Sequence, residues 1–217
     1  MAGPLTVVQL LPALDAGGVE RSTLEIAAAL LDAGHRAIVV SAGGRLVPAL
    51  QAIGAEHVAL AIGRKSLLTL RHIPTLRRLF RTTGVDIVHA RSRLPAWLGI
   101  AALRGMDAPP HLVTTMHGLN SPGRYSGVML RGERVICVSG TVRDYALRHY
   151  PAIDAARLTV IPRGVDPSAF SRAVVAPSDW RAQFLALHPQ LAGERLLLLP
   201  ARGTRLKGHV HALDLLG

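Results

Sequence analysis

The chain has 217 residues, of which 49% are hydrophobic, and its mean hydropathy is above zero. This length and composition predict a packed globular protein of one large domain, or of one and a half ordinary ones. No apolar run approaches the roughly 18 residues of a membrane-spanning helix, so we expect a chain that does not cross a bilayer. The 25 Lys and Arg outnumber the 14 Asp and Glu, and the formal net charge is +11.

The excess of positive charge implies acidic partners, which include nucleic acid, anionic lipid headgroups and nucleotide diphosphates. Aromatic residues make up only 4% of the chain, and Lys65 and Lys207 are its only lysines. The sequence also lacks an aromatic-rich stacking strand and a zinc-finger pattern. A nucleic-acid partner is therefore not expected.

The N-terminus and the single cysteine bear on the cellular compartment. The chain begins MAGPLTVVQLL and runs straight into an apolar strand, without a basic leader and a small-residue cleavage site. Cys137 lies in the apolar run VICV, which predicts a buried thiol and not a disulfide, a nucleophile or a metal ligand. We expect a cytoplasmic protein.

Strand-like apolar runs alternate with helix-like stretches along the chain. The expected strands are 5–11, 37–41, 58–62, 86–89, 112–115, 134–138, 158–161 and 196–199. The expected helices are 19–32, 45–52, 66–82 with an interruption at Pro74, 96–104 and 141–149. Such alternation is typical of parallel strands covered by helices on both faces, so we predict an α/β fold with a Rossmann-like sheet. In this fold the loops after the strands bind the ligand.

The pattern changes near residue 163. Residues 163–177 contain Pro, Ser and Asp with little periodicity, and 179–187 predict a short helix before the apolar run RLLLLP. We place the domain boundary near Ser171, so that 1–173 form an N-terminal Rossmann-like domain. Residues 174–217 would then be an interdomain segment and the first strand, loop and helix start of a truncated second domain of the same kind.

The glycine turn after the first strand is the first candidate site. Gly17 and Gly18 let the backbone approach a ligand closely, and the following helix presents unpaired N–H groups to the same place. The turn is suited to an anion or a sugar hydroxyl. The alternative is that the two glycines only form a tight turn.

A basic amphipathic stretch, RKSLLTLRHIPTLRRLFR, covers residues 64–81. Its leucines and six basic residues are suited to anionic lipid headgroups, which would bring the protein to a lipid-linked substrate. The alternative is that its apolar side only covers the sheet, as every helix of such a fold requires.

Six segments, in this order, resemble one known family: AGGVER (16–21), DIVHARSRLPAW (86–97), TMHG (115–118), VICVSG (135–140), IPRGVD (161–166) and ARGTRLKG (201–208). Together they resemble the family 4 retaining glycosyltransferases of the two-Rossmann-domain (GT-B) architecture. The resemblance is greatest to those that extend bacterial lipopolysaccharide cores and related polysaccharides. It covers the acceptor-side domain and the opening of the donor-side domain.

The resemblance implies a donor site. Gly17 and Gly18 would approach the donor sugar or phosphate, and His117 would hydrogen-bond the donor sugar at the reaction centre. Arg202 and Lys207 would hold the nucleotide diphosphate and stabilise its departing charge. The alternatives are a loop histidine bonded to backbone, and ordinary solvated loop charges. Ala201 and Gly203 depart from the usual pattern around Arg202.

The resemblance also implies residues on the acceptor side and in the cleft. Arg163 and Gly164 stand where the family commonly carries Asn-Gly. Arg91 and Arg93 would bind an anionic acceptor, or else form structural salt bridges. Ser139 is expected to cap a helix first and to contact a ligand second. Glu20, in the first glycine motif, completes this set.

The expected activity is a hexosyltransferase-like transfer from a nucleotide sugar to a saccharide or lipid-linked saccharide, with retention. No Asp-x-Asp motif is present, so no metal and no cofactor are expected. The protein would act in the cytoplasm, at the inner face of the membrane, and the 217-residue segment alone would be inactive. The alternative is a catalytically silent anion-binding or membrane-surface module. A dehydrogenase is disfavoured because the first turn lacks Gly-x-Gly-x-x-Gly.

Overall fold

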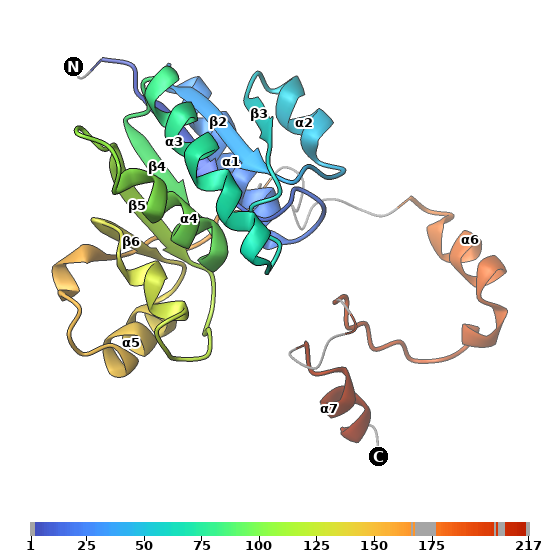
Figure 1. Cartoon of the computed structure of the whole chain (residues 1–217). Helices are drawn as coiled ribbons and strands as arrows, with labels where there is room; N and C mark the ends of the chain where they lie inside the picture. The colour runs from blue at the N-terminus through green and yellow to red at the C-terminus, as the bar shows by residue number, and fades with distance from the viewer. Residues whose placement is uncertain (1–2, 166, 168–176, 202, 204–206, 216–217) are drawn as a thin grey trace. The chain divides into compact units, whose positions relative to one another are not determined.

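The computed structural model describes residues 3–165, 167, 177–201, 203 and 207–215 (Figure 1). The chain divides into two compact units, residues 1–164 and residues 165–217. The sequence puts the domain boundary somewhat later, between 173 and 174. Residues 166 and 168–176 lie outside the described ones, so that boundary stays a prediction.

Seven parallel strands form one sheet in the first unit, in the order β3-β2-β1-β4-β5-β6-β7. They are β1 (Thr6–Leu10), β2 (Arg36–Ser41), β3 (Glu56–Ala59), β4 (Ile87–Ala90), β5 (His111–Met116), β6 (Arg134–Cys137) and β7 (Leu158–Val160). The chain adds β2 and β3 on one side of β1, then returns to add β4 to β7 on the other side. This Rossmann-like sheet confirms the predicted fold class. The reversal makes the carboxyl ends of β1 and β4 the expected place for a ligand.

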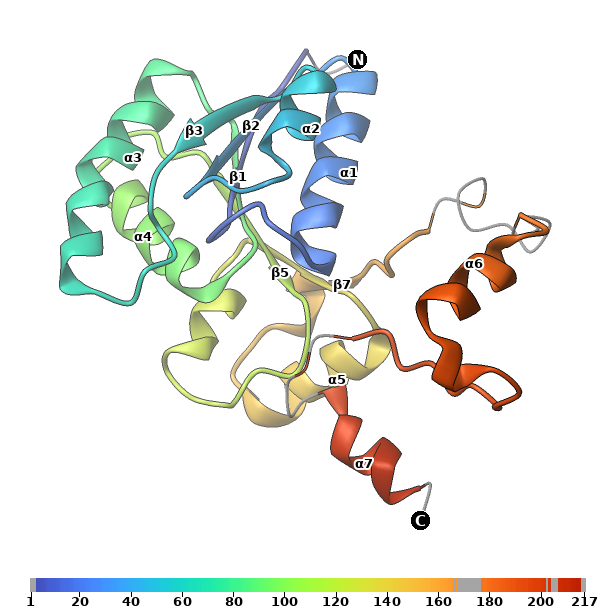
Figure 2. The ribbon, with the colours of Figure 1, turned by 90° about the vertical axis from the view of Figure 1, so that its right-hand side faces the viewer.

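Helices cover both faces of the sheet (Figure 2). They are α1 (Gly18–Asp32), α2 (Val47–Ala52), α3 (His72–Thr82), α4 (Arg93–Leu103) and α5 (Gly140–His149), with short 3-10 helices η1 (Leu67–Arg71), η2 (Ser126–Leu130) and η3 (Ala155–Arg157). Helices α1 and α2 lie on one face, and α3 and α4 lie on the other.

The two faces hold separate cores because successive strand side chains point to opposite sides. On β2, Ile38 and Val40 belong to the core that includes α3 and α4, whereas Ala37 and Val39 belong to the core under α1 and α2. Cys137 of β6 is fully buried in the larger core. Burial raises the pKa of its thiol, which confirms the predicted core cysteine.

The expected helix at 66–82 is divided in two. A 3-10 helix, η1, ends at Arg71, and the α-helix α3 starts at His72. Pro74 therefore lies in the first turn of α3, where the missing N–H has no helical partner to lose. The interruption expected at Pro74 occurs just before it.

The second unit contains α6 (Trp180–Leu187), η4 (Pro189–Leu191) and α7 (His209–Asp214). The strand expected at 196–199 is not formed: these four leucines have no strand assignment and are 42% to 83% exposed. A strand needs a neighbouring strand for its backbone N–H and C=O groups. Among the described residues of this unit there is no such neighbour.

No helix in the described part of the chain is both long enough and apolar enough to cross a membrane.

Candidate functional site

A cavity of about 300 Å³ lies in the first unit at the carboxyl edge of the sheet. It is enclosed by α1, by the residues that follow β4 and β5, and by the strand and loop residues of β6 and β7. The lining residues are Ser22, Glu25, Ile26, Arg91, Thr115, His117, Ile136, Val138, Ile161, Pro162, Arg163 and Gly164. The structure thus brings together four of the site residues that the sequence predicts: Arg91, His117, Arg163 and Gly164.

The glycine turn adjoins this cavity through Arg163. Gly17 precedes α1 with φ of 143° and ψ of 172°, a backbone conformation that is essentially restricted to glycine. The carbonyl oxygen of Gly18 accepts a hydrogen bond from Nη1 of Arg163. A Cβ at Gly18 would come within 2.5 Å of that same Nη1. The glycines therefore allow an arginine to approach the start of α1, and their contact with a donor stays a prediction.

Arg91 is a buried charge that joins three elements. It follows β4 directly, and only 3% of its surface is exposed. Its Nη1 donates to Gln9 Oε1 of β1 at 2.9 Å, and its Nη2 donates to Ser22 Oγ of α1. Burial and the neighbouring positive charge of Arg163 lower the pKa of Arg91 to about 10. The guanidinium thus stays charged at neutral pH and supplies a fixed cation to the cavity wall.

His117 follows β5 and lies near both arginines. Its Nδ1 is 2.8 Å from Nη2 of Arg163. Burial, together with the charges of Arg91 and Arg163, lowers its pKa to about 3. The ring is therefore neutral at physiological pH. Its Nε2 is buried and has no hydrogen-bond partner among the described residues.

The sequence interpretation missed a second buried histidine and its partner. His89 of β4 contacts Thr115 Oγ1 of β5 through Nε2 at 2.7 Å, and burial lowers the pKa of His89 to about 3. Thr115 itself lines the cavity. The sequence position of His89 and Thr115 could have indicated them, because both are polar residues near the carboxyl ends of buried parallel strands.

Three other predicted residues lie elsewhere in the first unit. Arg93 opens α4, donates to Ser126 Oγ at 3.2 Å, and lies over the ring of Tyr125. It does not join Arg91 in the cavity, since the helix that starts after Arg91 turns it toward η2. Ser139 caps α5 and accepts from the N–H of Val142 at 3.2 Å, which confirms its capping role. Glu20 lies in the first turn of α1 and is absent from the described cavity lining.

The predicted phosphate-binding pair belongs to the second unit. Arg202 lies outside the described residues. Lys207 is exposed and lies just before α7. Their function stays a prediction, as does a transfer without metal.

A doubly wound parallel sheet with a cationic cavity at its carboxyl edge defines a Rossmann-like domain with a candidate ligand site. Residues 16–169, well over half of the chain, match the family model described as Glycosyltransferase Family 4. The chain belongs to this family.

Known proteins share its fold and part of its sequence. A glycosyltransferase from Rickettsia africae superposes with a TM-score of 0.78 and is 32% identical, over 99% of this chain and 58% of that one. Anabaena HepE, solved with UDP and glucose, has a TM-score of 0.60 and is 21% identical, over 87% of this chain and 50% of its own. One subunit of the human phosphatidylinositol N-acetylglucosaminyltransferase is 25% identical over 71% of this chain. The chain spans only 35% of that relative.

Proposed function

We propose that the protein acts as a glycosyltransferase, which moves a hexosyl group from a nucleotide sugar to a saccharide or lipid-linked saccharide. The observation that carries the proposal is the cavity that contains Arg91, His117 and Arg163, in a chain that belongs to Glycosyltransferase Family 4. The Anabaena relative, whose structure holds UDP and glucose, supports this class of donor.

The charges of the cavity fit this chemistry. Departure of a nucleoside diphosphate develops negative charge, which fixed cations stabilise without reorganising. Arg91 is fixed by its bonds to Gln9 and Ser22. Arg163 lines the same cavity and bonds to Gly18 at the start of α1, where the helix N-terminus adds a partial positive charge.

The finer assignments extend from the motif resemblance. We propose retention at the anomeric carbon, a transfer that needs no metal, and a role in lipopolysaccharide or other cell-surface polysaccharide synthesis. The neutral ring of His117 would hydrogen-bond a donor sugar hydroxyl. The expected acceptor-binding pair of Arg91 and Arg93 is not part of this proposal, because Arg93 faces η2.

The test is a transfer assay with a panel of nucleotide sugars and core-saccharide acceptors. Because the chain spans 58% of the Rickettsia relative, the assay compares this chain with a form extended along the rest of its reading frame. Sugar transfer by the extended form, with an unchanged anomeric configuration by NMR, is the expected result. Arg163→Met should lower turnover, whereas Arg148→Met, on the exposed side of α5, should not.

The alternative is a catalytically silent anion-binding or membrane-surface module. It predicts that nucleoside diphosphates or anionic vesicles bind, while neither form transfers sugar with any donor of the panel. That combination of results would overturn the proposed transfer. Turnover by this chain alone, equal to that of the extended form, would overturn the expectation that the segment is inactive.

We also propose that an anionic membrane surface is a partner, and that it contacts only the first part of the basic stretch 64–81. On α3, Leu76 and Phe80 are fully buried, so this helix covers the sheet. Arg77 donates to the carbonyl oxygens of Ala101 and Ala102, and Arg81 donates to that of Gly105. These two arginines therefore bind the end of α4 and its following turn.

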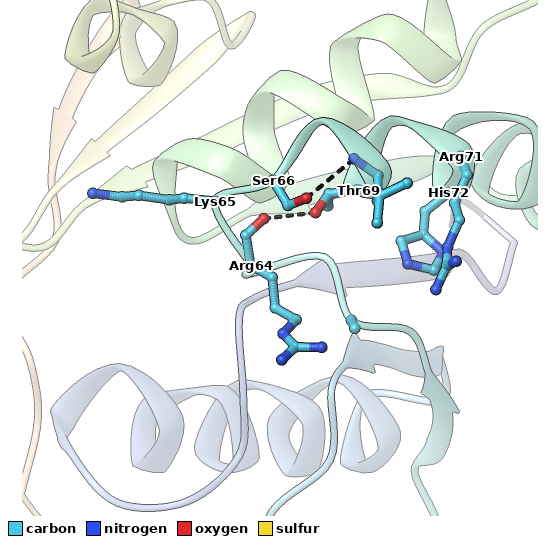
Figure 3. Close-up of a pocket in the computed structure, with 8 residues that line it drawn as sticks. Arg64, Lys65, Ser66, Thr69, Arg71 and His72 are labelled. Atoms are coloured by element: carbon cyan, nitrogen blue, oxygen red, sulfur yellow. Dashed lines mark hydrogen bonds between the residues drawn. The ribbon is translucent and has the colours of Figure 1, made fainter.

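In contrast to α3, the 3-10 helix η1 exposes its apolar side chains. Leu67, Leu68 and Leu70 are 86%, 70% and 52% exposed. A hollow of about 560 Å³ beside them is lined by Arg64, Lys65, Ser66, Thr69, Arg71 and His72, among others. The charged side chains fan out in different directions instead of converging on one ligand (Figure 3). This arrangement is suited to a surface of many headgroups rather than to a single phosphate.

A further inference from the structure

The contact between Arg163 and His117 determines where the imidazole proton lies. Nη2 of Arg163 is 2.8 Å from Nδ1 of His117. A guanidinium has only N–H donors, so Nδ1 must be the acceptor, and a neutral ring must then carry its proton on Nε2. We infer that Arg163 is a positioning residue, which holds His117 as the Nε2–H tautomer so that the ring donates a hydrogen bond to a ligand oxygen.

Arg163 is itself held in place by a second contact. Its Nη1 donates to the carbonyl oxygen of Gly18, at the start of α1. One guanidinium thus connects the residues after β7 with the glycine turn and the residue after β5. A side chain with a single donor group would not span both acceptors in the fixed planar geometry of arginine.

The Nε2–H group of His117 is available to an acceptor from outside the described part of the chain. Nε2 is buried, and no described residue accepts its hydrogen bond. A buried unpaired donor is unfavourable. A ligand oxygen that accepts from Nε2–H therefore removes this cost and adds the free energy of the hydrogen bond. Arg91 and Arg163 lie near the ring. The carboxylate among the cavity's lining residues, Glu25 of α1, makes no hydrogen bond with Nε2. Burial and the positive charges of the two arginines keep the ring neutral, with its one proton on Nε2.

This arrangement gives His117 one role and excludes another. With Nδ1 engaged by Arg163 and the proton on Nε2, the ring donates a hydrogen bond and has no free lone pair to act as a base. The oxygen that accepts this hydrogen bond would belong to a sugar hydroxyl or a phosphate of the donor, an identification that rests on the proposed function. The tautomer itself does not depend on that function.

The experiment reads the tautomer directly in the 217-residue chain labelled with ¹⁵N. The two ring nitrogens of His117 are observed by long-range ¹H–¹⁵N correlation, and they are assigned by comparison with His117→Gln. Arg163→Met removes the donor, Arg163→Lys keeps a cationic donor, and Arg148→Met is the matched control on exposed α5.

The native chain and the control should show His117 as a single Nε2–H tautomer. In Arg163→Met the population ratio of Nε2–H to Nδ1–H should fall by a factor of roughly 10 to 100, because a hydrogen bond from a charged donor is lost. The pKa of His117 should also rise, because one neighbouring positive charge is gone. Arg163→Lys keeps the charge but cannot span both acceptors, so its ratio should lie between those of the native chain and Arg163→Met.

Two results would overturn the inference. One is an Nδ1–H tautomer in the native chain, and the other is an unchanged ratio in Arg163→Met. Neither result requires a sugar donor or turnover. Failure of this inference therefore leaves the proposed transfer standing, and failure of the transfer assay leaves the tautomer measurement unaffected.

Discussion

At the scale of single residues, the cavity is organised by polar side chains that come from neighbouring strand ends. Gln9 of β1 accepts from Arg91 and donates through Nε2 to the carbonyl oxygen of Thr23 at 3.0 Å. Each of these contacts is buried, where an unpaired polar group would be costly. The bonds between β1, β4 and α1 thus fix Arg91 before any ligand arrives.

The first prediction concerns Gly17. Gly17→Ala should lower the free energy of unfolding by about 1–3 kcal/mol, because the φ of 143° is unfavourable for a residue with a Cβ. The new Cβ would also lie 2.6 Å from Glu20 Oε2. Gly140→Ala is the control, since Gly140 opens α5 and a Cβ there meets nothing within 4 Å. Chemical denaturation measures both. Equal free energies of unfolding for the Gly17→Ala and Gly140→Ala variants would contradict the strain argument.

The second prediction concerns His89. Its pKa is about 3 in the folded protein, below the ordinary value of 6.5. Between these pH values the unfolded chain binds a proton at His89 that the folded chain does not. The contribution of neutral His89 to the free energy of unfolding is therefore complete above pH 6.5 and is lost as the pH decreases toward 3. His89→Gln should flatten the stability profile by up to about 1.4 kcal/mol per pH unit in that window.

Denaturation curves at several pH values measure this slope. The comparison is with His149→Gln, which replaces an exposed histidine on α5. The same slope in the His89 variant as in the native chain would show that the buried ring does not carry the proton linkage. The variant at His117 is less suitable, because that ring also contacts Arg163.

The sequence predicts the role of a single residue when that role depends on residues close to it in the chain. Ser139 is followed three residues later by the N–H that it caps, and a cap of this kind is visible in the sequence. The bond from Arg163 to Gly18 joins residues 145 apart. No spacing rule predicts such a contact. The separation of Arg91 from Arg93 likewise depends on a helix that starts at Arg93.

At the scale of elements, the apolar runs predicted the seven strands of the first unit because most of them are buried in a parallel sheet. The edge strand β3 is the least buried, and it lies at 56–59 where the sequence predicts 58–62. The run 196–199 has the same composition but no partner strand among the described residues of its unit. Apolar composition therefore indicates that a segment can be a strand, and pairing decides whether it is one. The 3-10 helix η1 was likewise hidden within a continuous helical pattern.

Helix η1 is held at the same edge of the sheet as the cavity. Its cap, Ser66, accepts from the N–H of Leu68 at 3.2 Å, and Thr69 Oγ1 donates to the carbonyl oxygen of Arg64 at 2.6 Å. Gly63 lies so close to Pro12, in the loop after β1, that a Cβ there would overlap it. These contacts fix the loop that carries η1, and with it the exposed leucines of η1.

The third prediction is that Leu67→Gln with Leu68→Gln weakens binding to vesicles that contain anionic lipid. Both side chains are mostly exposed, so the change should remove membrane contact without disturbing the core. Ile53→Gln, at a half-exposed position after α2, is the control. Sedimentation with vesicles measures the partition. Equal partition of the double variant and the native chain would contradict a role for η1.

The charges of the same surface allow an independent test. Arg64→Gln with Arg71→Gln should weaken binding by roughly 1 kcal/mol per charge, with a smaller difference at high salt. Arg78→Gln with Arg148→Gln removes the same charge elsewhere and should have less effect. If both pairs lose binding equally, the net charge of +11 and not this surface determines attraction to the membrane.

At the scale of the whole molecule, the two units have different degrees of internal organisation. The first contains the complete seven-stranded sheet and both hydrophobic cores. The described residues of the second contain short helices, and none of their side chains is buried. Burial of apolar surface is the main favourable term in folding. The first unit should therefore carry the cooperative stability of the chain.

The last prediction follows from this difference. A fragment of residues 1–173 should melt cooperatively in circular dichroism, because all the strand pairings described lie within residues 1–164. Its midpoint should lie within a few degrees of that of the whole chain. Leu10→Ala, at a fully buried position of β1, is the comparison: it should lower the stability of both forms by about 2–5 kcal/mol. A broad transition in the fragment, with a cooperative one in the whole chain, would show that residues 174–217 complete the fold and would move the domain boundary accordingly.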